Sequence, residues 1–375
     1  MKICIDVSAA VHHRAGLGRY TQELTRALVA QGEHDYVAFY HQRGKAQLDP
    51  PMDRLPQLTT RLAVRPWRLT TMLAYFSGLA QDRLFPGVDV LHATEHLLPR
   101  LRRIPSVFTL HDLIFRFDPD SHLPLNRIYL NLMMPRFLRA ANAIIAVSEC
   151  TRRDAMRLYR TPAEKIHVVV EGVDASFKPI LDPARLAHVR EKYKLPERFV
   201  LFVSTIEPRK NLPVLLDALA SRRERGLKLW PLVIVGKLGW LYEPILQRIL
   251  DLNLQEWVHR TGYVSDQDLP VLYSAAALHV MPSRYEGFGL SVLESMACGT
   301  PVVCSNASSL PEVAGEAALM VPPDDVQGWS DTVTRVWDDA ALRAQMRERG
   351  QAHAARFTWE QAARKTADLY SQITH

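Results

Sequence analysis

The sequence of 375 residues has little of several features that mark other classes of protein. It has only four cysteines and no Cys-x-x-Cys pair, which excludes a disulfide framework and argues against a structural zinc site. No apolar stretch approaches the roughly 18 residues of a membrane-spanning helix, and the N-terminus lacks the apolar core of a signal peptide. The chain is therefore expected to be soluble and cytoplasmic.

Acidic residues are fewer than basic ones, 40 against 46, and the imbalance is uneven along the chain. Residues 1–185 hold 25 Lys and Arg against 18 Asp and Glu, whereas the remaining residues are close to neutral. A basic surface favours an anionic partner, such as nucleic acid, a membrane or a phosphorylated small molecule. No nucleic-acid-binding module is recognisable, so a basic nucleic-acid-binding protein is the weaker alternative.

Short apolar runs that alternate with amphipathic stretches are abundant. Runs rich in Val and Ile, such as residues 3–7, 106–110 and 199–203, predict buried parallel strands. Stretches with helical periodicity, such as residues 18–31, predict the connecting helices. Because this alternation continues over 375 residues, it predicts an α/β protein with two doubly wound, Rossmann-like domains.

Residues 282–294, with the sequence PSRYEGFGLSVLE, follow a predicted strand and open a predicted helix. Glycines let the backbone turn sharply, and free amides at a helix N-terminus bind phosphate. The carboxylates of Glu286 and Glu294 beside such a site suit the hydroxyls of a sugar or ribose. An ordinary strand–helix turn with a solvated Glu294 fits the residues equally well. The residues expected to offer backbone amides are Gly287, Phe288, Gly289, Leu290 and Ser291.

Residues 207–212, with the sequence EPRKNL, follow the predicted strand at 199–203. Ligands of open α/β sheets bind at the carboxyl ends of the strands. Arg209 and Lys210 are therefore candidates for binding phosphate, Arg209 as a fork of donors and Lys210 as a point charge. A solvated basic pair is the alternative.

The first predicted strand is followed by the sequence RAGLGRY, which places Gly16 and Gly18 in a loop before a helix. The third glycine of the dinucleotide-binding fingerprint is missing, since residue 21 is Thr, which argues against a dinucleotide site. An anion-binding loop and a plain tight turn both remain compatible. His111 follows the apolar run at 106–110. A histidine at this position is compatible with either a structural role or a role in the site.

Residues 61–85 combine arginines with aromatic and aliphatic side chains, among them Arg65, Trp67 and Phe76. An amphipathic helix of this composition can pack on the sheet or lie on an anionic membrane surface. Packing on the sheet is the simpler interpretation. Peripheral contact with the inner membrane face, through the basic first domain, is a further expectation.

Together these segments resemble the retaining nucleotide-sugar glycosyltransferases of family 4, which have the GT-B fold. The resemblance covers essentially the whole chain and is strongest over residues 264–325, where Glu286 and Glu294 match the family's Glu-x7-Glu signature. EPRKNL matches its diphosphate-binding stretch, and GLGRY and HDL match its donor-side loop and active-site histidine. VGKLGWLYEPI is similar to a mannosyltransferase-like branch that builds surface polysaccharides. In one departure, Glu171 begins the turn EGVD where the family often has Asn.

The resemblance implies two Rossmann-like domains that face a central cleft. Residues 1–180 are expected to form the acceptor-binding domain and residues 181–355 the nucleotide-sugar donor-binding domain. Residues 356–375 are expected to form a C-terminal helix that crosses back to the first domain.

The resemblance also implies a role for each matching residue. Among the catalytic residues, His111 would contact the transferring sugar, and Arg209 and Lys210 would neutralise the departing diphosphate. Glu286 would hold hydroxyls of the donor sugar, and Glu294 would hold the donor ribose. The residues expected to bind the donor are Gly16, Gly18, Lys237, Val264, Gly287, Phe288, Gly289, Leu290, Ser291 and Glu294.

The expected function is retaining transfer of a hexose, with GDP-mannose as the expected donor, to an acceptor hydroxyl in glycan or polysaccharide biosynthesis. The expected partners are the nucleotide-sugar and a glycan or lipid-linked acceptor, without nucleic acid. No cofactor and no metal are expected, because two cations would do what a divalent metal does elsewhere. The alternatives are a UDP- or dTDP-sugar donor and a nucleotide-sugar 2-epimerase of the same fold.

Overall fold

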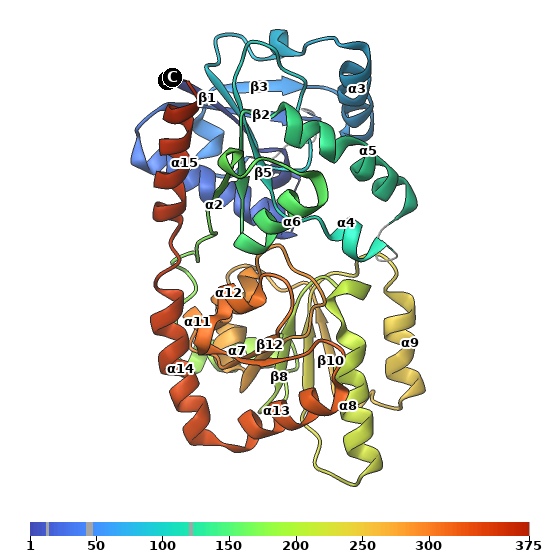
Figure 1. The fold of residues 1–375 in the computed structure, drawn as a ribbon. Helices are drawn as coiled ribbons and strands as arrows, with labels where there is room; N and C mark the ends of the chain where they lie inside the picture. The colour runs from blue at the N-terminus through green and yellow to red at the C-terminus, as the bar shows by residue number, and fades with distance from the viewer. Residues whose placement is uncertain (13–14, 43–47, 120–122, 375) are drawn as a thin grey trace. The chain divides into compact units, whose positions relative to one another are not determined.

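The structure is a computed structural model that describes residues 1–12, 15–42, 48–119 and 123–374 (Figure 1). The chain forms two compact units. The first unit comprises residues 1–117, 124–172 and 358–375, and the second unit comprises residues 118–123 and 173–357.

The first unit is built on a parallel sheet of seven strands in the order β3-β2-β1-β4-β5-β6-β7. Its central strands are buried along their whole length, as the continuous apolar runs predict. The edge strand β3 was not predicted, because its sequence QLTT is polar and only partly buried. The strands are β1 (Lys2–Asp6), β2 (Asp35–His41), β3 (Gln57–Thr60), β4 (Val90–Ala93), β5 (Ser106–Leu110), β6 (Ala143–Ala146) and β7 (Ile166–Val168).

Helices cover this sheet, and one of them comes from the far end of the sequence. In Figure 1 the C-terminal helix α15 lies beside α2, where the rings of Tyr20 and Trp359 are 5.9 Å apart. Gly172, the last residue before the second unit, passes against the backbone of Trp359, and a Cβ there would lie 2.2 Å from the Trp359 nitrogen. The helices are α1 (Ser8–Val11), α2 (Ala15–Gln31), α3 (Val64–Ser77), α4 (Ile114–Phe117), α5 (Pro124–Ala140), α6 (Glu149–Tyr159) and α15 (Trp359–Ile373).

The second unit has a parallel sheet of six strands in the order β10-β9-β8-β11-β12-β13, again doubly wound. The strands are β8 (Val200–Val203), β9 (Leu232–Val235), β10 (Val258–Gly262), β11 (Leu278–Met281), β12 (Val302–Ser305) and β13 (Leu319–Val321). The helices are α7 (Pro183–Lys192), α8 (Leu212–Glu224), α9 (Glu243–Asp251), α10 (Leu269–Ala275), α11 (Leu290–Ala297), α12 (Leu310–Ala314), α13 (Val326–Asp338) and α14 (Ala340–Ala354).

The boundaries between the units differ from those that the sequence predicts. The first boundary lies between residues 172 and 173 rather than at residue 180. Residues 173–180 belong to the second unit because Phe177 and Ile180 are buried in its core, and the Ile180 amide donates to Ser274 Oγ at 3.0 Å. The second boundary lies after residue 357 rather than 355.

The predicted loop before the first long helix is also corrected. Helix α2 begins at Ala15, so Gly16 and Gly18 lie in its first turns rather than in a loop. A Cβ at Gly18 would lie 3.0 Å from the Ala9 carbonyl oxygen, so glycine allows α1 and α2 to approach closely. Arg14, which precedes them, lies outside the described residues.

None of the helices that the structure describes is both long and apolar enough to cross a bilayer. The four cysteines are buried as free thiols, and a buried free cysteine packs as a small apolar side chain.

Candidate active site

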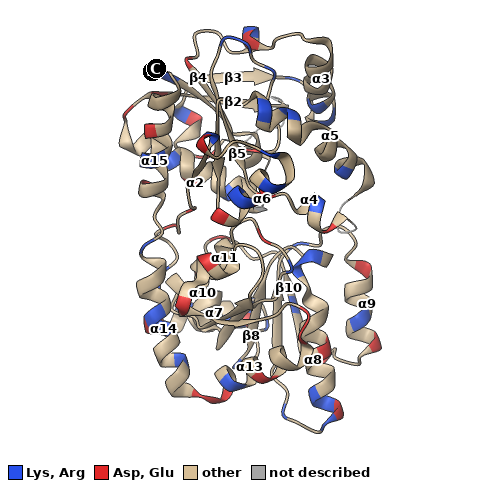
Figure 2. Cartoon of the chain, in the orientation of Figure 1, with Lys and Arg blue, Asp and Glu red and all other residues tan. Residues whose placement is uncertain are grey.

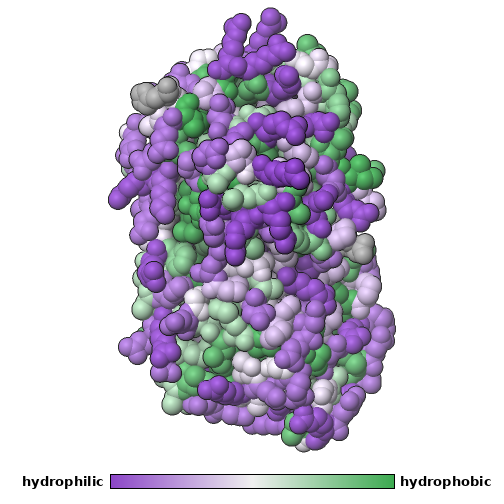
Figure 3. All heavy atoms as spheres, in the orientation of Figure 1, coloured by the Kyte–Doolittle hydropathy of each residue, from purple (hydrophilic) through white to green (hydrophobic). Residues whose placement is uncertain are grey.

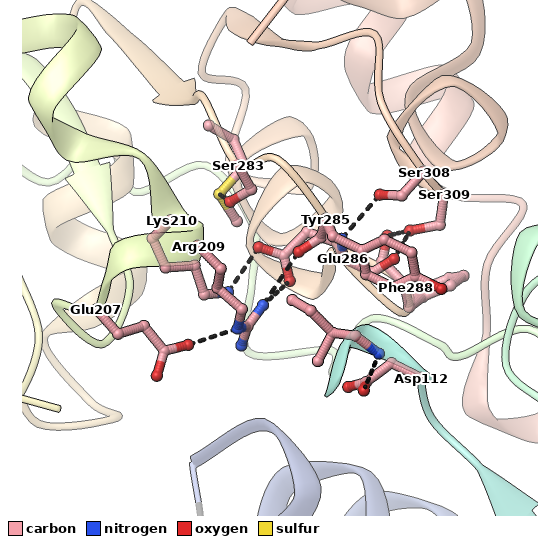
Figure 4. A network of polar contacts seen from close by, with 12 residues as sticks. Asp112, Glu207, Arg209, Lys210, Ser283, Tyr285, Glu286, Phe288, Ser308 and Ser309 are labelled. Atoms are coloured by element: carbon pink, nitrogen blue, oxygen red, sulfur yellow. Dashed lines mark hydrogen bonds and ion pairs between the residues drawn. The ribbon is translucent and has the colours of Figure 1, made fainter. Parts of the chain in front are cut away.

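Four charged side chains gather at the carboxyl end of the sheet in the second unit (Figure 4). Glu286 accepts from both predicted cations: Lys210 Nζ lies 2.6 Å from Oε1, and Arg209 Nη1 lies 3.0 Å from Oε2. Arg209 Nε lies 2.6 Å from Oε1 of Glu207. The sequence predicts Arg209, Lys210 and Glu286 as site residues, and the structure brings these three together.

Local backbone geometry explains how the cations reach Glu286. A single helical turn at Pro208–Lys210 follows the end of β8, and Asn211 ends it in the left-handed conformation with a φ of 54°. The Asn211 side chain donates to the carbonyls of Pro282 and Pro323, at 3.2 and 2.6 Å. The Arg284 amide donates to the Arg209 carbonyl at 2.9 Å. The turn and the glycine-containing loop are thus fastened directly to each other.

In this cluster, burial and the neighbouring opposite charges shift the pKa values of the side chains in opposite directions. Burial would raise the pKa of Glu286, but Lys210 and Arg209 more than offset it and lower that pKa to about 2. Burial, with a contribution from Arg209, lowers the pKa of Lys210, and Glu286 and Glu207 oppose that shift. Glu286 is therefore a stable carboxylate that accepts hydrogen bonds and holds two cations in place.

The loop between β11 and α11 has the turn that the sequence predicts. Gly289 has a φ of 116°, and a Cβ there would lie 2.8 Å from Leu310 Cδ2, so both its backbone conformation and its surroundings favour glycine. Ser309 Oγ donates to the carbonyls of Glu286 and Phe288, at 3.0 and 2.7 Å. The loop brings together Gly287, Phe288 and Gly289, and α11 begins with Leu290 and Ser291, whose amides belong to its first turn.

Glu294 lies on α11 and is buried, which corrects the alternative of a solvated residue. Its Oε2 accepts from the Tyr273 hydroxyl at 3.1 Å. Tyr273, on α10, is fully buried. It was not predicted, because its position beside Glu294 depends on how α10 and α11 pack.

Two of the residues expected to bind the donor, Lys237 and Val264, follow the ends of β9 and β10. Lys237 is exposed, and its Nζ lies 4.7 Å from the centre of the Tyr263 ring. Val264 follows Tyr263 and is buried. The Ile206 amide donates to the Lys237 carbonyl at 2.9 Å, so this loop is joined to the one that precedes Arg209.

In the first unit, His111 follows β5 and is buried. Its Nε2 lies 2.8 Å from the carbonyl oxygen of Thr94. His92 lies within β4 and is completely buried, and its ring hydrogen-bonds Thr109 and Tyr370 at 2.8 and 2.7 Å, which is a structural role. Gly16 and Gly18 lie in α2 of this unit.

Two groups of the site contain residues that the sequence reasoning did not assign. Glu207 stands within EPRKNL but was not given a role, although its acidic side chain beside Arg209 is a visible signal. Ser308 and Ser309 support the glycine-containing loop from more than twenty residues away, and nothing in their local sequence indicates this. Among the described residues, no three His, Cys, Asp or Glu side chains are placed to hold a metal ion.

Both halves of the sequence match known families. Residues 14–177 match the family described as Glycosyltransferase Family 4. Residues 187–353 match the family described as Glycosyl transferases group 1.

Individual relatives match over almost the whole chain. The O-antigen chain mannosyltransferase B of Escherichia coli is 32% identical, and the match covers 100% of both chains. The MMP alpha-(1->4)-mannosyltransferase of Mycolicibacterium hassiacum is 29% identical over 99% of this chain and 98% of the relative. HepE of Anabaena, solved with UDP-glucose, has the same fold, with a TM-score of 0.72 and 21% identity over 99% of this chain and 100% of that one. These matches confirm the GT-B fold, and the chain belongs to family 4 of the glycosyltransferases.

Proposed function

We propose that this glycosyltransferase moves a mannosyl group from GDP-mannose to a hydroxyl of a growing glycan, with retention at the anomeric carbon and without a metal ion. Two relatives that match nearly the whole chain are named mannosyltransferases, which supports mannose as the sugar. The observation that carries the proposal is the pairing of Arg209 and Lys210 with Glu286 beside the first turn of α11.

In this proposal the reaction breaks the bond between the anomeric carbon and the diphosphate, so negative charge builds on the departing phosphate oxygen. Arg209 and Lys210 are held in place before the donor arrives, so stabilising that charge needs little reorganisation. The amides of Leu290 and Ser291 lie at a helix N-terminus, which also favours phosphate. The acceptor attacks from the side of the leaving group, and the departing phosphate takes its proton.

Glu286 and Glu294 have acceptor oxygens for hydroxyl groups. Glu286, an ionised carboxylate, is proposed to hold hydroxyls of the mannosyl group. Glu294, which already accepts from Tyr273, is proposed to hold the ribose. His111 is proposed to contact the transferred sugar.

The donor assignment is tested by measuring release of nucleoside diphosphate from GDP-mannose, UDP-glucose and dTDP-glucose, with and without EDTA. We expect GDP-mannose to be used with the highest kcat/KM and EDTA to have no effect. The anomeric configuration of the product, read by NMR, is expected to match that of the donor. Preference for a UDP-sugar would contradict GDP-mannose as the donor, and loss of activity in EDTA would contradict independence from a metal ion. Release of a free 2-epimer without acceptor would contradict transfer to an acceptor hydroxyl.

We further propose that the first unit docks on an anionic membrane through the outer faces of α3 and α5. Leu69, Leu73 and Phe76 recur on one face of α3, and each is 50–55% exposed. Leu125 and Ile128 on α5 are 83% and 60% exposed. The two helices pack together, since Arg68 Nη1 donates to Asn126 Oδ1 at 3.0 Å. Figure 3 shows hydrophobic surface at the edge of the first unit where these helices lie.

The positive charge of these helices favours contact with an anionic membrane surface. Together α3 and α5 contain five arginines and no acidic residue. The basic residues of the chain are blue in Figure 2. Basic residues near an anionic bilayer contribute about 1 kcal/mol each, and burial of half-exposed leucines contributes a similar amount. The arginines are Arg65, Arg68, Arg127, Arg136 and Arg139.

Flotation with vesicles tests this surface. We expect the protein to bind vesicles rich in phosphatidylglycerol, to bind phosphatidylcholine vesicles weakly, and to be released by salt. A triple variant with Leu69→Ser, Leu73→Ser and Phe76→Ser should bind at least about tenfold more weakly, since it loses roughly 1 kcal/mol for each side chain. Leu250→Ser, an equally exposed leucine on α9 of the second unit, is the matched control. Equal binding of the triple variant and the parent would refute the assignment.

A further inference from the structure

The guanidinium of Arg209 is held by carboxylates on two sides (Figure 4). Its Nε lies 2.6 Å from Oε1 of Glu207, and its Nη1 donates to Oε2 of Glu286 at 3.0 Å and to the carbonyl of Tyr285 at 3.2 Å. A guanidinium is planar, and its N–H groups are donors in fixed directions. Contacts at two different nitrogens therefore set the direction of the whole group as well as its position.

Glu207 is almost completely buried, with 2% of the residue exposed, whereas the Arg209 side chain is 19% exposed. A carboxylate taken out of water in this way is costly unless a cation lies beside it. The guanidinium of Arg209 cannot lose its charge in a protein and has no acceptor atom, so Oε1 of Glu207 receives in this contact. Burial thus ties Glu207 to Arg209, while Arg209 itself keeps a route to solvent.

The backbone around Glu207 is fixed from both sides. Its carbonyl accepts from the Lys210 amide at 3.1 Å, which closes the turn that carries both cations. In the loop after β9, the Gly239 amide donates to the Ile206 carbonyl at 3.0 Å, and a Cβ at Gly239 would lie 3.3 Å from Glu207 Cβ. The glycine therefore lets this loop pack closely on Glu207. Glu207 has a fixed place from which it contacts Arg209.

The two carboxylates differ in the other groups that they contact. Glu286 contacts both cations, since Lys210 Nζ lies 2.6 Å from its Oε1. In the proposed function it also accepts from hydroxyls of the donor sugar, which compete with the cations for its two oxygens. In the part of the chain that the structure describes, Glu207 forms one ion pair, with Arg209. Glu207 is therefore free of the conflict that the sugar creates at Glu286.

Repulsion between the two neighbouring cations makes a second carboxylate necessary. Burial and, after it, Arg209 lower the pKa of Lys210, which reflects the cost of placing two positive charges together. Without Glu207, Arg209 and Lys210 would share the single carboxylate of Glu286. Because Arg209 is partly exposed, the repulsion would then favour turning its guanidinium toward solvent.

We propose that Glu207 is a positioning residue for Arg209: it keeps the guanidinium oriented toward the departing diphosphate while Glu286 binds the donor sugar. The proposal rests on the proposed function, in which Arg209 stabilises the negative charge of that diphosphate. Glu207 acts through Arg209 and needs no contact with the donor.

NMR relaxation of the Arg209 Nε–H group in the full chain tests this pair without a substrate. We expect its order parameter to be above about 0.8 in the parent and below about 0.6 in Glu207→Ala, because the contact at Nε is lost. Glu207→Gln keeps an oxygen at the same place and should resemble the parent. The signal is assigned by its absence in Arg209→Lys. Asp217→Ala is the matched control: Asp217 lies 2.6 Å from Nε of Arg248, so this variant should loosen Arg248 and leave Arg209 unchanged.

Steady-state kinetics of mannosyl transfer provides the second measurement. We expect Glu207→Ala to lower kcat by about 10–100-fold with little change in the KM for the donor, since a misplacement of about 1 Å costs up to about 10²-fold. Glu207→Gln should recover most of this loss, and Asp217→Ala should keep the kcat of the parent. In an Arg209→Ala background, Glu207→Ala should lower kcat no further, because a residue that acts only through Arg209 has nothing left to position.

An equal loss of kcat from Glu207→Ala in the parent and in the Arg209→Ala background would overturn the proposal. An Arg209 signal that stays rigid in folded Glu207→Ala would also overturn it. A mobile Arg209 signal with an unchanged kcat would instead contradict the role of Arg209 in the proposed function and leave the pair intact. If Glu207→Ala is unstable, Glu207→Leu fills the same space without an acceptor and gives both readouts.

Discussion

Lys210→Ala is expected to lower kcat by about 10²–10³-fold, the loss that follows removal of one preorganised charge from a developing anion. Lys210 is buried, and its ammonium lies 2.6 Å from Glu286, so its position is fixed before the donor binds. A charge that acts mainly in the transition state lowers kcat more than it raises KM. Steady-state kinetics with varied donor concentration separates these two effects.

Two further variants, Lys192→Ala and Lys210→Arg, are the controls for this experiment. Lys192→Ala removes a lysine of the same unit that pairs with Asp268 at 2.6 Å on the surface, and its kcat should equal that of the parent. Lys210→Arg retains the positive charge and should recover part of the lost rate. Unchanged kcat in a Lys210→Ala protein that keeps its circular dichroism and thermal transition would remove Lys210 from the reaction.

Glu286→Gln is expected to change how the stability of the second unit depends on pH. The pKa of Glu286 falls from 4.5 to about 2 on folding, so its contribution is complete above pH 4.5 and is lost as the pH falls toward 2. This difference corresponds to about 3 kcal/mol. At pH 7 the variant should therefore unfold at a lower temperature than the parent. The difference between the two unfolding temperatures should become smaller below pH 4.5. Calorimetry at pH 3, 5 and 7 measures both effects.

Asp217→Asn is the matched control for this experiment. Asp217 also forms a 2.6 Å contact with an arginine in the second unit, but both partners are partly exposed. Ion pairs between partly exposed groups contribute about 0–1 kcal/mol to stability. This variant should therefore unfold at nearly the same temperature as the parent at every pH. If the unfolding temperatures of Glu286→Gln and the parent depended on pH in the same way, Glu286 would not be held as an ionised group in the folded protein.

The sequence predicted the features that depend on local pattern. Buried strands such as β6 and β8 consist of continuous apolar residues, so their positions can be read from the sequence of each strand alone. Arg209 and Glu286, which are 77 residues apart, were each predicted as site residues, but their direct contact was not predicted. The edge strand β3 and the first turn of α2 were missed because polar edge residues and glycines carry weak local signals.

Residues that act through another side chain could not be predicted in this way. Tyr273 reaches Glu294 only because α10 packs beside α11, and the His111 ring bonds Thr94 through a backbone carbonyl that any residue possesses. These relationships depend on tertiary packing, which no single stretch of sequence contains.

The placement of α15 has a consequence for synthesis on the ribosome. The first unit includes residues 358–375, and Tyr370 bonds the buried His92 at 2.7 Å. A nascent chain therefore cannot complete its N-terminal unit until the whole second unit has left the exit tunnel. The second unit is continuous enough to fold earlier, so the order of completion runs opposite to the order of translation. A fragment that stops at residue 172 would expose the surface that α15 covers on α2 and would be prone to aggregate.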